Sequence, residues 1–584
     1  MPGDGPMALD LRQWHLTSEN AGKLSVANWV DSKQLPWIII CLGIILRCAQ
    51  YLANRSLWFD ESSLALNIVQ RSFSQLLQPL DYDQGAPIAF LLVEKSFIQA
   101  FGNNEYILRL FPLLSGVASL VLFYKLAKEF LTPKAVPIAL GLFAILDPLI
   151  YYSSEAKQYS SDVTTALILY VVITPYLEQK RFAFRDIVLF GAIGSAAIWF
   201  SHPSIFILAG TGLILFLLCL SEHAWRKIGQ LSIAYSLCVL NFFLVYSISL
   251  HHLSNDRNML DYWKGSFMPF PPTMSYSDVT WFINTFFKIF ETPVGLALPG
   301  IAALTFIVGC YFFFADRKAK LFALILPIGF TLLASGLHKY PFSGRLLLFI
   351  VPSILLLIAE GVAQFMGRVR PDAAVVSFTL IGLLFFQPLF FATYDLVRAP
   401  RTHEEIKPVL NYIREHWQSG DTLYLYYSAR YAFKYYKKDY GFTDGDYIVG
   451  MDLGDNWNNW DDRMNDLKRL RDARRVWILF AHVSHKRGVD EEKLFLHYFD
   501  GMGEQRDSYK TDGVAAYLYE PRPAQGSLKL LPQNGRQPLC PYVSYTLSSA
   551  GRYFAPIHGL WSGAARFAQA DPIRHALSIP WGST

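Results

Sequence analysis

The chain has 584 residues, of which 52% are hydrophobic and 17% are charged, and its formal net charge is +5. Soluble globular domains carry roughly 25% charged residues, so this composition excludes an ordinary soluble enzyme and indicates a protein largely embedded in lipid. The basic residues form short clusters between apolar runs, which is typical of membrane topology signals, and no nucleic-acid partner is expected.

Residues 1–35 are polar and mixed in charge, without an apolar core followed by a small-residue cleavage site. They do not have the pattern of a cleavable signal peptide. We therefore expect a cytoplasmic N-terminal segment, followed by a first span that serves as an uncleaved anchor.

Eleven apolar stretches are long enough to cross a hydrocarbon core of about 30 Å. They lie near residues 36–53, 106–130, 133–151, 160–178, 185–200, 203–220, 229–250, 294–315, 321–337, 343–366 and 374–395. Lys and Arg gather in one set of alternate loops, which are expected to be cytoplasmic. This topology puts the loops at 54–105, 151–159, 251–293 and 338–345 on the outer side. An odd span count places residues 397–584 there as well.

The first outer loop carries two helical patterns. Residues 61–78 place five apolar side chains on one stripe, and a second amphipathic segment runs from Pro87 to Phe101. Both patterns predict helices that lie in the membrane surface.

From about residue 403 the pattern alternates between helix-like and strand-like runs, among them DTLYLYYS, YIVGMD, RVWILFAHV and GVAAYLYE. This predicts a small α/β domain. The expected fold class is mainly α: a multi-pass transmembrane helical bundle at 36–396 with an exposed α/β domain at 397–522. Residues 523–584 show no clear periodicity, and no structure is predicted for them.

Asp60 and Glu61 follow the first span in the segment RSLWFDESSLAL. Asp60 could be the N-cap of the surface helix, with Glu61 favouring its positive end. A carboxylate here could also act as general base on an acceptor hydroxyl, and the helix start could receive a phosphate. The two interpretations are compatible.

Two further outer loops carry polar clusters. One contains Glu155, Lys157, Tyr159 and Asp162, and the other contains His338, Lys339, Tyr340 and Arg345. The cations could bind a lipid-linked phosphate, although Lys and Arg at span ends also commonly extend to the headgroups. Because all three clusters fall on the same side of the predicted topology, a shared outer-face site is expected.

No metal or cofactor site is predicted. His482, His485, His251 and His252 lack the further ligands that zinc requires, and no nucleotide-binding glycine motif is present. Five of the six cysteines lie in apolar segments, so they cannot form a disulfide framework.

Four segments occur in order along the chain: WFDE, GAPIAFLLVEKSFIQAFGNNEYILRLFPLLSG, YYSSEAKQYSSD and KYPFSGRLLLFIVP. Over roughly residues 36–395 they resemble the C-type (GT-C fold) membrane glycosyltransferases. This superfamily contains protein O-mannosyltransferases and aminoarabinose transferases, and the likeness is strongest to bacterial RgtA/B/C/D-like glycosyltransferases. It implies transfer of a hexose or pentose, with inversion, from a polyprenyl-phosphate donor to a glycan, lipid or protein acceptor. The reaction would occur on the periplasmic side of the cell inner membrane.

By position, the resemblance implies that Asp60 is the catalytic base and Glu61 its acidic neighbour. Glu155, Lys157 and Tyr159 would contact sugar and phosphate, and Arg345 would face the departing lipid phosphate. Asp162, Lys339 and Tyr340 complete the predicted substrate-binding set. Many relatives have a His-Pro-Pro pattern where this chain reads Gln84, Gly85, Ala86, Pro87, so it has no His to make a substrate contact there.

Three alternatives remain. A transporter or flippase predicts ionisable residues repeated through the spans and inverted repeats; neither is seen, and Glu360 is the clearest ionisable residue within a span. A non-catalytic scaffold predicts that Asp60 and Glu61 can be replaced without loss of product. A glycan ligase of the same fold is the third alternative.

Overall fold

The computed structural model describes residues 33–178, 183–368, 374–398, 400–452, 465–470, 473–484 and 490–522. Most of the predicted N-terminal segment, the predicted tail 523–584, and His485 lie outside these residues. The described residues up to Arg522 belong to one compact unit.

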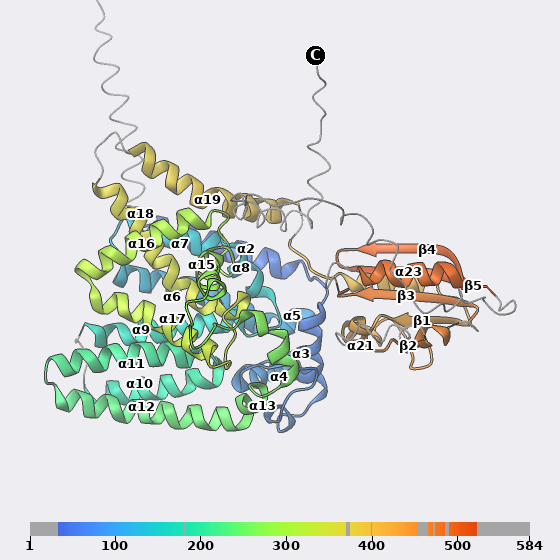
Figure 1. Ribbon diagram of the computed structural model, residues 1–584, viewed down its shortest axis with the longest axis horizontal. Coiled ribbons are helices and arrows are strands. Elements are labelled where there is room, and N and C mark those ends of the chain that lie inside the picture. The colour runs from blue at the N-terminus through green and yellow to red at the C-terminus, as the bar shows by residue number, and fades with distance from the viewer. Residues whose placement is uncertain are drawn as a thin grey trace, which may run out of the picture. The chain divides into compact units, whose positions relative to one another are not determined.

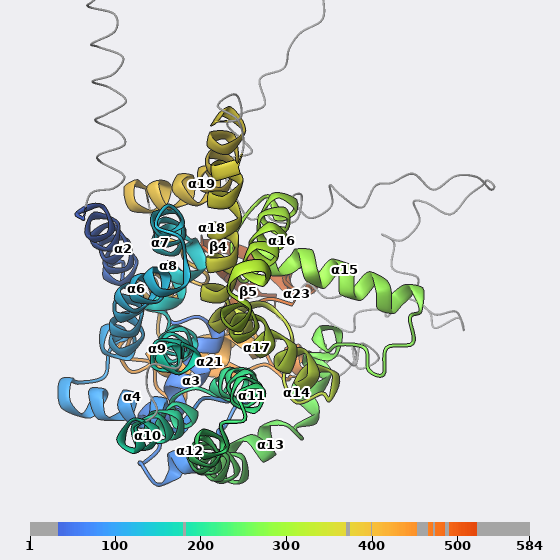
Figure 2. The same ribbon diagram turned by 90° about the vertical axis from the view of Figure 1, so that its left-hand side faces the viewer.

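The described part of the chain before residue 398 is mainly helical (Figures 1 and 2). The longer ones are α2 (Leu35–Leu52), α3 (Phe59–Gln70), α4 (Ile88–Phe101), α6 (Leu110–Phe130), α7 (Ala135–Ile145), α9 (Tyr159–Leu177), α10 (Phe184–Phe200), α11 (Ser204–Ser221), α12 (Trp225–Val245), α15 (Tyr276–Glu291), α16 (Pro299–Asp316), α17 (Lys318–Gly336), α18 (Val351–Arg368) and α19 (Ala374–Val397). The shorter ones are η1 (Gln75–Leu77), α5 (Glu105–Leu108), α8 (Asp147–Tyr151), η2 (Tyr152–Ser154), η3 (Tyr246–Leu250), α13 (His251–Leu253), α14 (Arg257–Tyr262), η4 (Lys264–Ser266) and η5 (Gly344–Ile350).

Nine of the described helices are long and apolar enough to cross a membrane, and a tenth span results if the bent pair α7 and α8 counts as one. The bend of 58° falls where Pro148 opens α8, as expected for a residue that favours a helix start. The remaining predicted span, 185–200, is α10, a helix of 17 residues. A multi-pass helical bundle is therefore confirmed, and the count of eleven spans stays a prediction.

Small residues allow two of these helices to approach closely. A Cβ on Gly309 of α16 would lie 1.9 Å from the Leu357 carbonyl oxygen, and one on Gly361 of α18 would lie 1.9 Å from the Thr305 carbonyl oxygen. Glycine at both positions lets the backbones pack against each other, as is common between membrane helices.

The first outer loop differs from its prediction. The predicted helix at 61–78 is two pieces: α3 ends at Gln70, and only Gln75–Leu77 form a further short helix, because the backbone is extended at Arg71. All residues from Asp60 to Ile68 are buried. Leu64, Ala65 and Ile68 share a hydrophobic core with α4 and with residues of the C-terminal domain, so α3 is covered by protein and does not lie open on a membrane surface.

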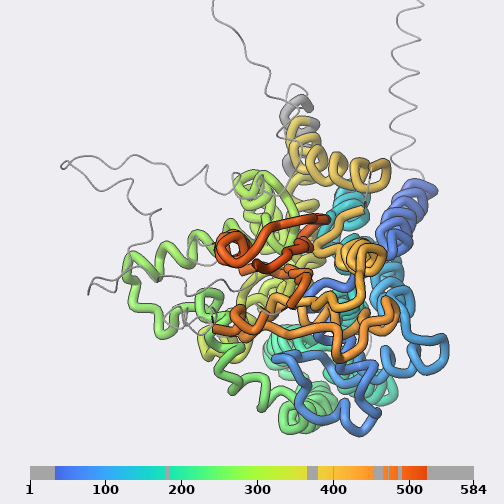
Figure 3. The backbone as a smooth tube through the Cα atoms, turned by 90° about the vertical axis from the view of Figure 1, so that its right-hand side faces the viewer, coloured from blue at the N-terminus to red at the C-terminus, as the bar shows by residue number. Residues whose placement is uncertain are grey.

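The C-terminal domain contains α20 (Ile406–Glu415), η7 (Tyr427–Ala429), α21 (Arg430–Tyr436) and α23 (Glu491–Met502) around a five-stranded sheet. Its strands are β1 (Asp421–Leu425), β2 (Tyr447–Val449), β3 (Arg475–Ala481), β4 (Gly503–Thr511) and β5 (Val514–Pro521). In Figure 3 this domain lies toward the viewer, drawn in orange and red.

The order of strands is β2-β1-β3-β5-β4; β1 pairs in parallel with β2 and β3, and β5 is antiparallel to β3 and β4. The predicted α/β domain is confirmed in its class. The predicted limits at 397 and 522 stay predictions; α19 ends at Val397 and α20 begins at Ile406.

Candidate active site

The start of α3 is held by carboxylates of the C-terminal domain. Trp58 is the N-cap, and its side chain makes no capping bond. The Phe59 amide instead donates to Glu404 Oε2 at 2.9 Å, and the Ser56 amide donates to the Glu405 carboxylate at 3.1 and 3.2 Å. The interpretation of Asp60 as N-cap is therefore wrong; Asp60 and Glu61 lie in the first turn, where negative charge is favoured by the helix dipole.

Asp60 lies between two cations. Its Oδ1 is 2.9 Å from Lys157 Nζ, and its Oδ2 is 2.6 Å from Arg345 Nη2. Lys157 Nζ also donates to Gln84 Oε1 at 2.5 Å. Burial acts to raise the pKa of Asp60, but the charges of Lys157 and Arg345, with side-chain hydrogen bonds, outweigh it and hold the pKa at about 2. Asp60 is thus fully ionised at neutral pH.

Glu61 is fully committed to protein contacts. Arg109 donates to both of its oxygens, from Nε at 2.9 Å and from Nη2 at 2.7 Å, and the Ala156 amide donates to Oε1 at 2.8 Å. Arg109 also donates to the carbonyls of Arg55 and Ser56. Burial opposes ionisation, yet Arg109 and Arg55 lower the pKa of Glu61. Glu61 therefore ties α3 to the second outer loop and has no oxygen free for substrate.

Glu155 is the third carboxylate of the cluster, and its environment differs. Its Oε1 accepts a hydrogen bond from Trp58 Nε1 at 3.1 Å, while its buried Oε2 has no hydrogen-bond partner among the residues that the structure describes. Burial raises the pKa of Glu155 to about 7, and repulsion by Glu61 adds to this, although Arg345 and Arg55 act against it. Glu155 can therefore exchange a proton near neutral pH.

Arg345, in η5, extends into the cluster between two aromatic rings. Its guanidinium carbon lies 5.3 Å from the centroid of Trp58 and 5.5 Å from that of Tyr159. Cation–π contacts of this kind are made more often by Arg than by Lys.

The structure thus brings together six of the predicted residues: Asp60, Glu61, Glu155, Lys157, Tyr159 and Arg345. That they form a substrate site stays a prediction. The other three predicted residues make different contacts. Tyr340 donates to the Leu346 carbonyl at 2.8 Å, next to Arg345. Asp162 is buried in α9, and one of its oxygens has no hydrogen bond within the described part of the chain. Lys339 is exposed, and its Nζ lies 3.4 Å from Asn255 Oδ1.

Several residues of the cluster were missed in the sequence. Arg109 stands at the start of a span, where a membrane-end cation was the ordinary interpretation. Gln84 occupies the segment that departs from the His-Pro-Pro pattern, and it nevertheless contacts Lys157. Glu404 lies 345 positions from Phe59, and no local signal links them.

Among the residues that the structure describes, no group of three or more His, Cys, Asp and Glu side chains could hold a metal ion. Two cationic side chains already flank Asp60. Independence from metals stays a prediction.

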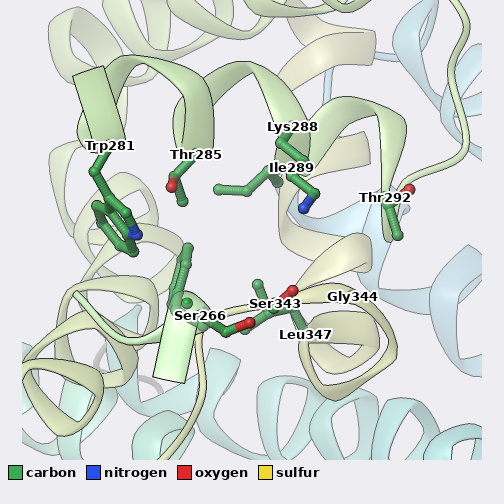
Figure 4. Close-up of a pocket in the computed structure, with 11 residues that line it drawn as sticks. Ser266, Trp281, Thr285, Lys288, Ile289, Thr292, Ser343, Gly344 and Leu347 are labelled. Atoms are coloured by element: carbon green, nitrogen blue, oxygen red, sulfur yellow. The ribbon is translucent and has the colours of Figure 1, made fainter. Parts of the chain in front are cut away.

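A small cavity of about 50 Å³ lies beside the segment that leads into Arg345. Figure 4 shows Thr285 and Lys288 of α15 on one side of it, and Ser343 and Gly344 on the other. This outer-loop helix and the segment that leads into Arg345 therefore line the same cavity.

No protein-family model matches the chain, and no curated protein matches its sequence. Among solved structures it is similar to ArnT from Cupriavidus metallidurans bound to undecaprenyl phosphate, with a TM-score of 0.50 and 11% identity, covering 83% of this chain and 98% of ArnT. It also matches the Archaeoglobus fulgidus oligosaccharyltransferase in complex with zinc and sulfate (TM-score 0.49, 11% identity, 82% of this chain and 72% of that one). A third match is the mycobacterial arabinofuranosyltransferase AftD (0.43, 13%, 84% and 41%).

The similarity to ArnT shows a shared fold, and this confirms the GT-C fold that the resemblance of the motifs predicts. At 11% identity the likeness concerns the fold.

Proposed function

We propose that the protein is an inverting glycosyltransferase that moves a hexose or pentose from a polyprenyl-phosphate sugar to an acceptor hydroxyl. The reaction would take place on the periplasmic face of the cell inner membrane. The observation that carries this proposal is the buried Asp60 between Lys157 and Arg345, on a fold shared with ArnT, which was solved with undecaprenyl phosphate.

The two cations are suited to the donor phosphate. Arg345 offers a planar fork to phosphate oxygens, and Lys157 offers a point charge. As the bond between the anomeric carbon and the phosphate oxygen breaks, negative charge accumulates on the lipid phosphate. Fixed cations stabilise that charge more in the transition state than in the ground state, which is the condition for acceleration.

Asp60 is the proposed proton acceptor. In the free enzyme a pKa of about 2 makes it a weak base. A donor phosphate that shares Lys157 and Arg345 adds negative charge beside Asp60 and draws the cations away, so its pKa rises when the donor is bound. Donor binding would thus convert an ion-paired carboxylate into a base.

The proposed step is a single displacement. The acceptor oxygen forms a bond to the anomeric carbon on the face opposite to the phosphate, and the phosphate leaves with the electron pair of the broken bond. The hydroxyl proton passes to Asp60. The products are the glycosylated acceptor, with inverted configuration, and polyprenyl phosphate.

Glu155 is the alternative proton acceptor, because it has an unpartnered buried oxygen and a pKa of about 7. If Asp60 is the base, Asp60→Asn abolishes transfer while donor binding persists. If Glu155 is the base, Glu155→Gln has this effect. Asp60→Asn and Glu155→Gln each keep the side-chain shape and remove the base.

The test is sugar transfer from a panel of polyprenyl-phosphate sugars by membranes that contain wild type, Asp60→Asn or Glu155→Gln at matched expression. Asp83→Asn is the control: Asp83 is exposed in the same outer loop, and its φ of 52° is one that Asn adopts readily. We expect wild type and Asp83→Asn to release polyprenyl phosphate and form product, and Asp60→Asn to form none. Full activity of Asp60→Asn would refute the base assignment, and no donor consumption by wild type would refute the transferase.

A further inference from the structure

A second cavity, of about 330 Å³, lies in the C-terminal domain at the residues that join it to the bundle. His403 and Glu404 precede α20, His482 and Val483 follow β3, and Glu492 belongs to α23. The end of β4 contributes Lys510 and Thr511, the turn after it Gly513, and the start of β5 Val514 and Ala515. Its volume falls within the range of about 300–1,000 Å³ that small-molecule sites occupy.

The cavity shares a wall with the segment that carries Asp60. The ring of His403 stacks on Trp58 at 5.0 Å between centroids, and the ring of His482 stacks on Phe59 at 4.4 Å with 12° between the planes. Trp58 in turn donates to Glu155 and lies against Arg345. The indole of Trp58 therefore contacts both the cavity wall and the ionic cluster.

The lining is mixed in a way that suits a saccharide. Glu404 and Glu492 supply acceptors, Lys510 supplies a donor, and the hydroxyl of Thr511 can do both. Phe480, Val514 and Ala515 are buried behind this lining, and the partly exposed ring of His482 is the surface against which the C–H face of a sugar ring can pack. The negative charges of Glu404 and Glu492 repel a phosphate, so the cavity does not suit the charged part of the donor.

The polar groups are also held in place. Glu404 is fixed by the Phe59 amide and by His482 Nδ1 at 2.7 Å. Glu492 is fixed by Tyr517 and lies 3.4 Å from Lys510 Nζ. Preorganised hydrogen-bonding groups lose little entropy on binding, which is the property of a built site.

We propose that this cavity binds the acceptor and that the acceptor is a saccharide. The sugar units next to its reacting hydroxyl occupy the cavity, and the hydroxyl reaches Asp60 past Trp58. The inference rests on the proposed transferase function and specifies its acceptor class as a glycan. The C-terminal domain then contributes the acceptor site, while the bundle contributes the donor site.

Binding is tested first, with the full chain in lipid nanodiscs and methyl glycosides and disaccharides of common hexoses and pentoses as probes, followed by saturation-transfer NMR. We expect at least one probe to bind wild type and Asp60→Asn equally, and to bind Glu492→Gln and Lys510→Ala at least five-fold more weakly. Lys438→Ala, on the exposed surface of the same domain, is the control and should match wild type. If no probe binds at millimolar concentration, or if the cavity variants bind as wild type does, the proposal is overturned.

Transfer kinetics separate the two proposals. In Glu492→Gln and Lys510→Ala we expect a raised KM for the glycan acceptor with an unchanged KM for the donor. Transfer with wild-type acceptor KM in both variants overturns the cavity assignment and leaves the transferase intact. If the cavity variants weaken probe binding but wild type consumes no donor, the proposed transferase function is overturned and the saccharide site stands.

Discussion

The Glu404 carboxylate accepts a hydrogen bond from the backbone amide of Phe59 at 2.9 Å, across 345 positions of sequence. Phe59 is the first residue of α3 and directly precedes Asp60. The C-terminal domain therefore contributes to the placement of the segment that carries the proposed base, in addition to any part it plays with substrate. An acidic group at this end of the helix satisfies an amide without an intrahelical partner and favours the dipole.

Replacement of Glu404 tests this relationship. We expect Glu404→Ala to lower the free energy of unfolding by about 1 kcal/mol, the usual cost of a lost helix cap. It should also reduce kcat, because α3 carries Asp60. Thermal unfolding in nanodiscs and donor turnover measure the two effects. Glu415→Ala, on the exposed face of α20, is the control, and equal behaviour of the two variants would contradict the capping role.

Arg345 is expected to act mainly in the transition state. Arg345→Ala removes one of the two cations at Asp60 and the guanidinium held between Trp58 and Tyr159. We expect kcat to fall by about 100-fold, the scale seen when one preorganised charge-stabilising donor is lost, with a smaller change in donor affinity. Steady-state kinetics with a polyprenyl-phosphate sugar measure both quantities.

The matched control for Arg345 is Lys339→Ala. Lys339 lies on the preceding loop, but it is exposed and contacts Asn255. Its removal should leave kcat within about two-fold of wild type, because a solvent-exposed charge interacts weakly. A raised KM with unchanged kcat in Arg345→Ala would show that Arg345 contributes uniform binding only.

How much of this site the sequence could predict depends on the range of the interactions. The positive-inside rule placed Asp60, Lys157 and Arg345 on one side of the membrane, and the structure joins them. The partner of Glu61 could not be predicted, because nothing local distinguishes Arg109 from other cations at span ends. The strand β4 was also missed, since its sequence GEQRDSYKT is polar and its pairing with β5 depends on tertiary contacts.

Tertiary contacts that the sequence does not show also explain why the helix predicted at 61–78 was wrongly placed in the membrane surface. The apolar stripe at 61–78 indicated a helix with one buried face, and periodicity alone cannot tell lipid from protein as the covering. In the structure, Leu64 and Ile68 pack in one core with Ile406 and Leu410 of α20. Burial by a domain that begins more than 300 residues later is a tertiary effect.

The raised pKa of Glu155 predicts a pH dependence of stability. Its carboxyl keeps the proton up to about pH 7 in the folded state but releases it near 4.5 in the unfolded chain. Between these values the unfolded state binds fewer protons, so the free energy of unfolding falls as pH rises. The contribution of Asp60 has the opposite sign and lies at lower pH, because its folded pKa is about 2.

Glu155→Gln should remove this slope. We expect the unfolding temperature of wild type to fall between about pH 5 and pH 7.5, and that of Glu155→Gln to change less over the same range. Glu105→Gln is the control: burial raises the pKa of Glu105, but Lys407 outweighs this and lowers it, so its removal should leave the slope intact. Parallel curves for wild type and Glu155→Gln would contradict the raised pKa.

The pair formed by Glu61 and Arg109 provides the last prediction. Both side chains are almost fully buried and bonded through two parallel contacts of 2.9 and 2.7 Å. Removal of one partner leaves a buried charge unpaired, at a cost of about 3–5 kcal/mol. Glu61→Gln and Arg109→Gln should therefore each strongly reduce the amount of folded protein in membranes.

The double variant leaves neither charge, and its loss of stability should be smaller than the sum of the two single losses. Thermal unfolding of wild type, the two single variants and the double variant measures the coupling between Glu61 and Arg109. If the losses simply add, the pair is not coupled. If Glu61→Gln is as stable as wild type but has lost transfer, Glu61 acts on the reaction directly and the assignment of a positioning role is wrong.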